Sequence, residues 1–208
     1  MVSVFAPRPC SLGEGPLWHP LRGELFWFDI NAHQLLSKTA VWKFDEYVSA
    51  AGWISHDELL IASESQLFRF HLGDHNQTKL CDLEANNPIT RSNDGRCDPQ
   101  GGFWIGTMGK KAEAKAGAIY RYYRGNLVQL FPEITIPNAI CFALDGHTAY
   151  FTDTPLRQIL AVDLDTDGWP CSAPRVAVDL TGTAENPDGA VVDAQGNIWN
   201  AQWGAARL

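Results

Sequence analysis

The stretch that decides the fold is "AICFALDGHTAYFTDT", which runs from Ala139 to Thr154. A short apolar run is followed by a polar turn with glycine and then by alternating aromatic or aliphatic residues. This order is typical of a β-hairpin, because residues at every second position line one face of a strand and glycine permits a tight turn. The stretch therefore predicts two antiparallel strands joined at Gly146.

The same pattern occurs five times in the chain of 208 residues. The other copies are "GPLWHPLRGELFWFDI" (15–30), "AGWISHDELLIASE" (51–64), "GRCDPQGGFWIGTM" (95–108) and "GAVVDAQGNIWNAQW" (189–203). Their turns centre on Gly23, Asp57, Gly101, Gly146 and Gly196, so successive turns are 34, 44, 45 and 50 residues apart. Further strand pairs follow the hairpins, as in "GAIYRYYRGNLVQLF" (117–131).

Four strands in about 45 residues is the repeat of a β-propeller blade. We therefore predict an all-β protein, a β-propeller with about four to five blades represented in this chain. A β-sandwich is the rival architecture, but it offers no reason for a fixed spacing between hairpins.

Composition and charge narrow the range of partners. The net charge is −8, from 16 basic and 24 acidic residues, which argues against a nucleic-acid backbone as partner. No apolar run approaches the roughly 20 residues of a membrane helix, and the N-terminus lacks the apolar segment of a secretory signal. The five cysteines are odd in number and form no C-x-x-C, which is typical of unreactive thiols in a reducing cytosol. We predict a cytoplasmic protein with no nucleic-acid or membrane partner.

Polar side chains recur at one phase of the repeat, seven to nine residues before the turns. They are Glu14, Asn93 with Asp94, Asn138 and Asp188. Innermost strands of a propeller line a central channel, so residues at this phase should gather around one axis. Carboxylate and amide oxygens suit Ca²⁺, Mg²⁺ or Mn²⁺, whereas Zn²⁺ usually prefers nitrogen or sulfur. The alternative interpretation is that these side chains cap turns, and periodicity alone does not separate the two.

Four blocks of the sequence resemble a known family. They are "SLGEGPLW" (11–18), "RSNDGRCDPQGGFWIGTM" (91–108), "IPNAICFALDGHTAYFTDT" (136–154) and "NPDGAVVDAQGNIWNAQWGAARL" (186–208). Together they resemble the senescence-marker-protein/regucalcin/gluconolactonase family of six-bladed propellers, and in particular its bacterial sugar-acid lactonases. The resemblance covers most of the chain from Cys10 to Leu208.

The resemblance implies a site and a reaction. One divalent metal ion, Ca²⁺, Zn²⁺, Mg²⁺ or Mn²⁺, would be held by Glu14, Asn138 and Asp188. Arg91 and Asn93 would bind the substrate, and Asn93 could also reach the metal directly or through water. The implied activity is metal-dependent hydrolysis of a small sugar (aldono-) lactone to the sugar acid by a metal-activated water. Asp188 would also be catalytic, as the acceptor of the water's proton.

Two other functions fit the same residues. The first is a calcium-binding regulatory protein with little or no catalysis, since an oxygen-only ligand set serves it equally well. The second is a propeller scaffold for protein partners, in which the channel residues are structural. A metal-dependent esterase or phosphotriesterase belongs to the same class as the lactonase, because a cation and a water do not dictate the leaving group.

The fifth hairpin falls at the end of the chain. We therefore expect residues 1–208 to form a single but partial β-propeller domain, with about 80 C-terminal residues of the family's fold absent. Because a propeller closes by pairing its terminal strands, the expected metal site depends on ring closure.

Two motifs imitate metal sites. "DLDTDG" (163–168) looks like the start of an EF-hand loop, but the twelfth position would be Pro174 in place of Glu, and we expect an Asp-rich turn between outer strands. His71 and His75 lie four residues apart in a segment that predicts a strand followed by a turn, so we expect no zinc site there.

Four tryptophans recur at related positions of the hairpins: Trp18, Trp27, Trp104 and Trp199. Large aromatic side chains contribute much of the buried area where elements pack together. We expect these four to pack between blades and not to stack on nucleic-acid bases.

Overall fold

The computed structural model describes residues 3–208 and consists almost entirely of antiparallel β-strands. It divides into two compact units, one ending at Asn86 and the other formed by Asn87–Leu208. Each unit is a run of β-meanders, in which every strand pairs with the next one along the chain. The two units are described separately below.

Unit 1 contains two four-stranded sheets, the first two blades. The first is β1 (Gly13–His19), β2 (Glu24–Asp29), β3 (Gln34–Ser37) and β4 (Val41–Lys43); the second is β5 (Val48–Trp53), β6 (Glu58–Ser63), β7 (Gln66–His71) and β8 (Gln77–Asp82). The first strands of the two sheets, β1 and β5, lie in contact.

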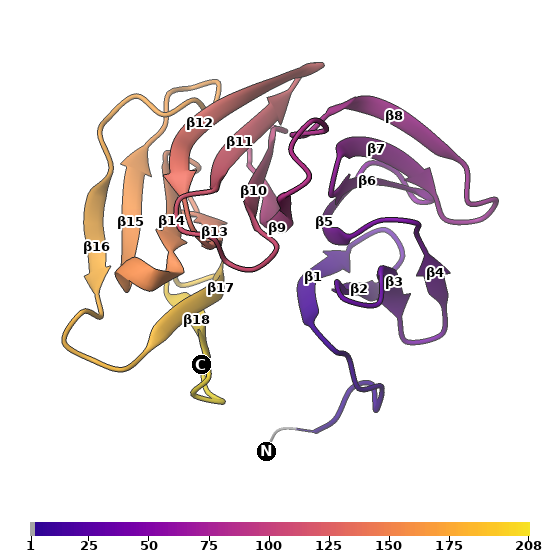
Figure 1. Ribbon diagram of the computed structural model, residues 1–208, viewed down its shortest axis with the longest axis horizontal. Helices are drawn as coiled ribbons and strands as arrows, with labels where there is room; N and C mark the ends of the chain where they lie inside the picture. Colours follow the sequence, from indigo (N-terminus) through magenta and orange to yellow (C-terminus); the bar gives the residue numbers. More distant parts are fainter. Residues whose placement is uncertain (1–2) are drawn as a thin grey trace. The chain divides into compact units, whose positions relative to one another are not determined.

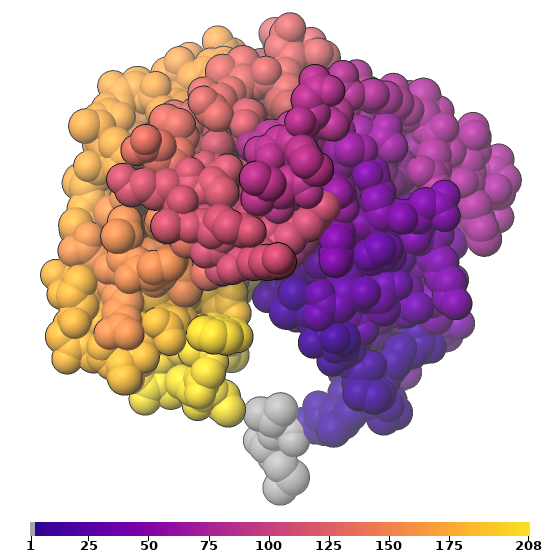
Figure 2. Space-filling model, viewed as in Figure 1, coloured from indigo at the N-terminus to yellow at the C-terminus, as the bar shows by residue number. Residues whose placement is uncertain are grey.

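Unit 2 contains two further four-stranded sheets and one two-stranded sheet. Blade three consists of β9 (Thr90–Cys97), β10 (Phe103–Gly109), β11 (Gly117–Tyr123) and β12 (Asn126–Ile134). Blade four consists of β13 (Pro137–Phe142), β14 (Thr148–Asp153), the 3-10 turn η1 (Thr154–Leu156), β15 (Gln158–Asp163) and β16 (Arg175–Asp179). The fifth blade is represented by β17 (Asn186–Val192) and β18 (Ile198–Trp203). Within this unit the sheets lie beside one another in sequence order, and β13 contacts both β9 and β17 (Figure 1; Figure 2).

Glycine makes the hairpin turns possible. Gly23, Gly101, Gly146 and Gly196 have φ angles of 62°, 86°, 72° and 86°, in the left-handed region that most other residues avoid. Each lies between the first and second strands of its sheet, where the repeat predicted a turn. The predicted hairpin positions are therefore confirmed.

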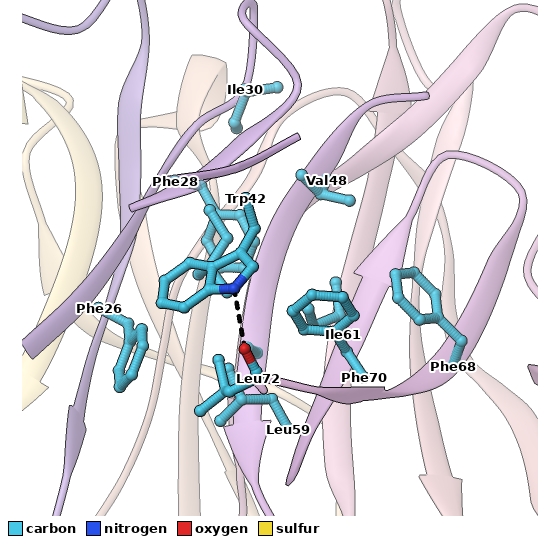
Figure 3. Packing of buried hydrophobic residues seen from close by; sticks show 12 residues of the cluster. Phe26, Phe28, Ile30, Trp42, Val48, Leu59, Ile61, Phe68, Phe70 and Leu72 are labelled. Carbon is cyan, nitrogen blue, oxygen red and sulfur yellow. Dashed lines mark hydrogen bonds between the residues drawn. The ribbon is translucent and has the colours of Figure 1, made fainter. Parts of the chain in front are cut away.

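Alternating apolar residues of facing sheets form the cores. In unit 1, Phe26 and Phe28 of β2 pack against Leu59, Ile61 and other apolar side chains of the second blade (Figure 3). Trp42 closes this core, and its indole N–H donates to the carbonyl of Leu72 at 3.1 Å. In unit 2 a second cluster joins blades three and four. Each fully buried side chain of this size stabilises the fold by about 1.5–3 kcal/mol.

The prediction for the tryptophans is only partly right. Trp104 is fully buried in the core between blades three and four, as expected. Trp18 and Trp199 are 58% and 53% exposed, so they do not pack between blades in this chain. Trp18 lies on β1 and Trp199 on β18, while Trp27 of β2 is half-buried.

The predicted fold class is confirmed: the protein is all-β, with four propeller blades and the first hairpin of a fifth. The two imitations of metal sites are the expected turns. Residues 165–168 form a turn between β15 and β16, and His71 ends β7 with its Nδ1 2.8 Å from Oδ1 of Asp74. The prediction of a single domain over residues 1–208 stays a prediction.

Candidate functional site

The first strand of every sheet contains a β-bulge near its start. In β1, Glu14 and Leu17 pair with Phe28 and Phe26, so two residues of β1 lie opposite one residue of β2. Equivalent register shifts occur in β5, β9, β13 and β17. A bulge leaves a residue unpaired, bends the strand and changes where the neighbouring side chains point.

The predicted site residues lie on these bulges. Glu14 and Asn138 are the last paired residues before the bulges of β1 and β13. Asn93 and Asp188 are the first residues within the bulges of β9 and β17. The phase that the sequence repeat predicted therefore lies at the bulge or immediately before it in β1, β9, β13 and β17. The second blade has a register shift in β5 but no predicted site residue there.

Arg91, Asn93 and Asn138 are joined by hydrogen bonds in unit 2. Nη1 of Arg91 donates to Oδ1 of Asn93 at 2.9 Å and to the carbonyl of Ser92 at 2.8 Å. Nδ2 of Asn93 donates to Oδ1 of Asn138 at 3.2 Å and to the carbonyl of Pro137 at 2.9 Å. All three side chains are buried, so blades three and four meet at a polar contact between their first strands.

Thr154, which the sequence pattern did not single out, extends this row to the fifth blade. Its Oγ1 accepts a hydrogen bond from Nδ2 of Asn138 at 3.0 Å and donates to the carbonyl of Pro187 at 2.8 Å. Pro187 immediately precedes Asp188. The only signal in the sequence was its place after "FTD", at the end of the block that contains Asn138.

Asp94 and Arg96 of β9 hold the neighbouring bulge of β13. The backbone N–H of Ile140 donates to Oδ2 of Asp94 at 2.8 Å, and the carbonyl of Ile140 accepts from Nε of Arg96 at 3.0 Å. Nη2 of Arg96 also reaches the carbonyl of Ala190 in β17 at 3.2 Å. Both backbone groups of Ile140 are thus satisfied by side chains of the preceding blade, since Ile140 lies in the bulge and has no paired residue in β14.

Asp188 and Asp94 both have raised pKa values. Burial raises the pKa of Asp188 above its ordinary value, and the charge of Asp94 raises it further. Burial also raises the pKa of Asp94, although the positive charge of Arg96 opposes this. A nearby cation would favour the ionised form of Asp188.

Glu14 lies in unit 1. It is half-buried at the bulge of β1, next to Gly15, whose φ is +57°. A Cβ atom on Gly15 would lie 2.2 Å from the carbonyl oxygen of Ser49, so β1 and β5 approach closely at this point. Glycine is required here both by the backbone conformation and by the lack of space.

The donor atoms of unit 2 fit a divalent cation. Asn138 offers its amide oxygen and Asp188 its carboxylate, and both are hard oxygen ligands. Within residues 3–208 there is no cluster of three or more His, Cys, Asp or Glu side chains able to hold a metal ion. The predicted set of Glu14, Asn138 and Asp188 uses two acids and one amide, and as a complete set it stays a prediction.

A cavity of about 230 Å³ opens in unit 1 and contains none of the predicted site residues. Its lining residues are Phe44, Asp45, Glu46, Val48, Ser63, Ser65, Gln66, Phe68 and Gln77. Oε1 of Glu46 accepts hydrogen bonds there from Oγ of Ser63 and Oγ of Ser65. No residue of the row of hydrogen bonds in unit 2 lines this cavity.

Two other expectations concern the location of the protein. No helix within residues 3–208 has the length and apolar character needed to cross a bilayer. All five cysteines, which lie within the described residues, are free thiols. A cytoplasmic location and the absence of nucleic-acid partners stay predictions.

The first strands of these propeller blades carry carboxylate and amide side chains at or beside their bulges. This combination defines a class of propeller protein with polar groups on its inner strands. Within that class, the chain belongs to the SMP-30/Gluconolactonase/LRE-like family, whose characteristic region matches residues 12–208. The family resemblance noted from the sequence is therefore confirmed.

Individual relatives are also similar over nearly the whole chain. A protein of Rhizobium meliloti (strain 1021) with the provisional name sugar lactone lactonase is 42% identical over 95% of this chain and 69% of its own length. An L-arabinolactonase of Azospirillum brasilense is 34% identical over 99% of this chain and 72% of its own length. The crystal structure of a calcium-binding protein, regucalcin, from Agrobacterium tumefaciens str. C58 superposes with a TM-score of 0.92 at 42% identity, covering 95% of this chain and 69% of that one.

Proposed function

We propose that this chain hydrolyses a sugar (aldono-) lactone to the corresponding sugar acid, with the help of one divalent cation. The observation that carries the proposal is the row of hydrogen bonds from Arg91 through Asn93 and Asn138 to Thr154 and Pro187, which aligns polar groups of three successive blades. The lactonase names of two relatives, at 42% and 34% identity, support the substrate class.

Asn138 and Asp188 would hold the cation together with Glu14. When bound, the cation would polarise the lactone carbonyl and acidify a nearby water. Arg91 and Asn93 would orient the sugar hydroxyls and the carbonyl oxygen, because they are buried donors on the same row. Which of Ca²⁺, Zn²⁺, Mg²⁺ or Mn²⁺ serves best is a question for metal titration.

Asp188 is the proposed base. Its carboxylate would accept a proton from the water that attacks the carbonyl carbon. As the acyl carbon–ring oxygen bond breaks, the same proton would pass to the ring oxygen, which becomes a hydroxyl group. One water is consumed and one hydroxy acid is formed, so no covalent intermediate with the protein is needed.

Hydrolysis of a lactone panel tests the proposal, since acid release can be followed with a pH indicator. We expect EDTA to abolish turnover, and a divalent metal to restore it. Asp188→Ala should lower kcat/KM by about 10²–10⁴-fold, because it removes both a ligand and the base. Asp167→Asn is the matched control, as it changes an exposed carboxylate in the turn before β16. Turnover that resists EDTA or survives Asp188→Ala would refute the mechanism.

Calcium binding without turnover is the second candidate. The name of the Agrobacterium relative, a calcium-binding protein called regucalcin, favours it. Calorimetry with Ca²⁺ followed by the lactone panel on the same sample separates the two functions. Tight Ca²⁺ binding with no acid release from any lactone would favour the second candidate.

A further inference from the structure

We propose that Thr154 is a positioning residue: its hydroxyl holds the Asn138 amide with Oδ1 presented for ligation and ties Asn138 to the strand of Asp188. This inference rests on the proposed function, since it assigns Thr154 a task at the same site. Thr154 touches no substrate in this role and acts only through its two neighbours.

The proton of the Thr154 hydroxyl decides the orientation of Asn138. The carbonyl of Pro187 can only accept a hydrogen bond, so the single proton on Oγ1 points toward it, over a distance of 2.8 Å. The lone pairs of Oγ1 therefore face Asn138, and only the NH₂ end of that amide can approach them. The observed 3.0 Å contact between Nδ2 of Asn138 and Oγ1 is the one arrangement that satisfies both groups.

The other end of the row imposes the same orientation independently. Arginine carries donors only, so the contact of Arg91 with Asn93 must use Oδ1 of that amide, as it does at 2.9 Å. The NH₂ group of Asn93 then faces Asn138 and finds its Oδ1 at 3.2 Å. The row begins at the guanidinium of Arg91, which can only donate, and ends at the carbonyl of Pro187, which can only accept. All the hydrogen bonds between these side chains therefore run in the same donor-to-acceptor direction.

Thr154 is itself held firmly. Its backbone N–H donates to the carbonyl of Ile136 at 3.0 Å, and its own carbonyl accepts from the N–H of Arg157 at 3.1 Å. The carboxylate of the preceding residue, Asp153, accepts from the N–H groups of Thr135 and Ile136 at 3.1 and 2.8 Å. With only 6% of its surface exposed, Thr154 can transmit a fixed geometry between β13 and β17.

The orientation of Asn138 matters because its amide is a dipole. Oδ1 attracts a cation, whereas the NH₂ end repels one. If Thr154 loses its hydroxyl, only the contact with Asn93 still orients the amide of Asn138. Nδ2 of Asn138 is then buried without its hydrogen bond to Thr154, so the amide is held less firmly. Groups that orient a metal ligand typically contribute 10- to 100-fold to metal affinity.

The test measures Mn²⁺ affinity by calorimetry in four proteins: the wild-type chain, Thr154→Val, Thr154→Ser and Thr166→Val. Valine keeps the shape and removes the hydroxyl, and serine keeps the hydroxyl and removes the methyl. Thr166→Val makes the same chemical change at an exposed turn. We expect Thr154→Val to weaken Mn²⁺ binding by about 10- to 100-fold, and the other two variants to bind as the wild type does.

A second readout does not depend on the variants. In the wild-type chain, the side-chain NH₂ protons of Asn138 should exchange slowly and show separate NMR signals without added metal. Rapid exchange of these protons would overturn the inference, even if Thr154→Val failed to fold. So would equal Mn²⁺ affinity of Thr154→Val and the wild type, or failure of Thr154→Ser to preserve binding. If the wild-type chain bound none of Ca²⁺, Zn²⁺, Mg²⁺ and Mn²⁺, the proposed function would fail together with the inference. The other outcomes overturn the inference alone, so the two failures are distinguishable.

Discussion

Two buried arginines of blade three have opposite surroundings. Arg121 of β11 is enclosed beside Asp98, just beyond the end of β9, whereas Arg91 lies near the start of β9 and begins the row of amides. Both are almost inaccessible to solvent. Burial of a charged residue therefore does not by itself identify a functional site. The hydrogen-bond partners of the residue distinguish a structural role from a functional one.

Arg121 is committed to holding the fold. Its Nε donates to Oδ2 of Asp98 at 2.6 Å, and its Nη2 donates to the carbonyl of Asp167 in blade four at 2.8 Å. The rings of Tyr123 and Trp169 each lie 4.4 Å from the guanidinium carbon. A carboxylate and two aromatic faces leave little room for a ligand, so this cluster ties two blades together.

Arg91 instead orders side chains of changeable orientation. Its partner Asn93 could present either end of its amide, and so could Asn138 beyond it. The guanidinium of Arg91 can only donate, so it fixes which end of each amide faces which neighbour. A fixed orientation matters where one particular atom must face a ligand. Arg121 is thus held in a buried ion pair, whereas Arg91 heads a row of amides at the site that we propose.

Breaking the enclosed ion pair should have the largest effect. Asp98→Asn leaves the charge of Arg121 buried without its counter-ion, so we expect the free energy of unfolding of unit 2 to fall by about 3–5 kcal/mol. Urea denaturation measures this loss. Arg175→Met is the control, because it breaks an ion pair with Asp163 in which both side chains are about half exposed, and should cost about 0–1 kcal/mol. Similar losses in the two variants would contradict the contrast between the enclosed and the exposed pair.

Arg91→Met should affect activity more than stability. We expect kcat/KM toward a lactone to fall by about 10- to 100-fold, because a charged hydrogen bond to substrate contributes about 1.5–3 kcal/mol. The free energy of unfolding should fall by about 1.5 kcal/mol, the lower end of the contribution of a hydrogen bond from a charged group, and so by less than in Asp98→Asn. Steady-state kinetics and urea denaturation on the same preparation check both numbers. A variant that loses stability as Asp98→Asn does, with unchanged kcat/KM, would place Arg91 in the structural class.

Two glycines allow a similar comparison between a crowded position and an open one. Gly168 and Gly196 have φ angles of +82° and +86°, but a Cβ on Gly168 would lie 2.6 Å from Nη2 of Arg121, while one on Gly196 meets nothing within 4 Å. Gly196→Ala should cost about 1–2 kcal/mol through its backbone alone. Gly168→Ala should cost more, because the guanidinium is held on several sides and cannot move away freely. Equal shifts in urea midpoint would show that the Arg121 cluster is looser than we describe.

The smallest effect concerns two aspartates of the last hairpin, β17–β18. Burial raises the pKa of Asp188, whereas hydrogen bonds from Asn197, Trp199 and Gln195 lower the pKa of Asp193 to about 2. A lowered pKa means that the stabilisation from Asp193 is complete above its unfolded pKa of about 3.9 and is lost as pH falls through about 2. In an NMR titration, the indole N–H of Trp199, which donates to Asp193 at 2.8 Å, should report this step. A midpoint near 4 would contradict the predicted hydrogen bonds.

Much of the fold could be predicted from the sequence because each hairpin is a local structure. The alternating apolar residues and the glycines with positive φ lie within a dozen residues of one another, as in the hairpin at Gly146. The phase of the polar residues was also readable, since Glu14, Asn93, Asn138 and Asp188 recur eight or nine residues before the turns. The exposure of Trp18 and Trp199 was not readable, because it depends on which sheets are present beside them.

By itself, then, the sequence determined the blades, the family and the position of polar oxygens on β1, β9, β13 and β17, because short-range patterns encode all three. Only the tertiary structure decided that Asn138 meets Asn93 and Thr154, that Asp94 and Arg96 hold the bulge at Ile140, and that Arg121 pairs with a carboxylate while Arg91 pairs with an amide. These contacts join different segments of the chain, and the direction of each hydrogen bond depends on the donors and acceptors that packing brings to both ends.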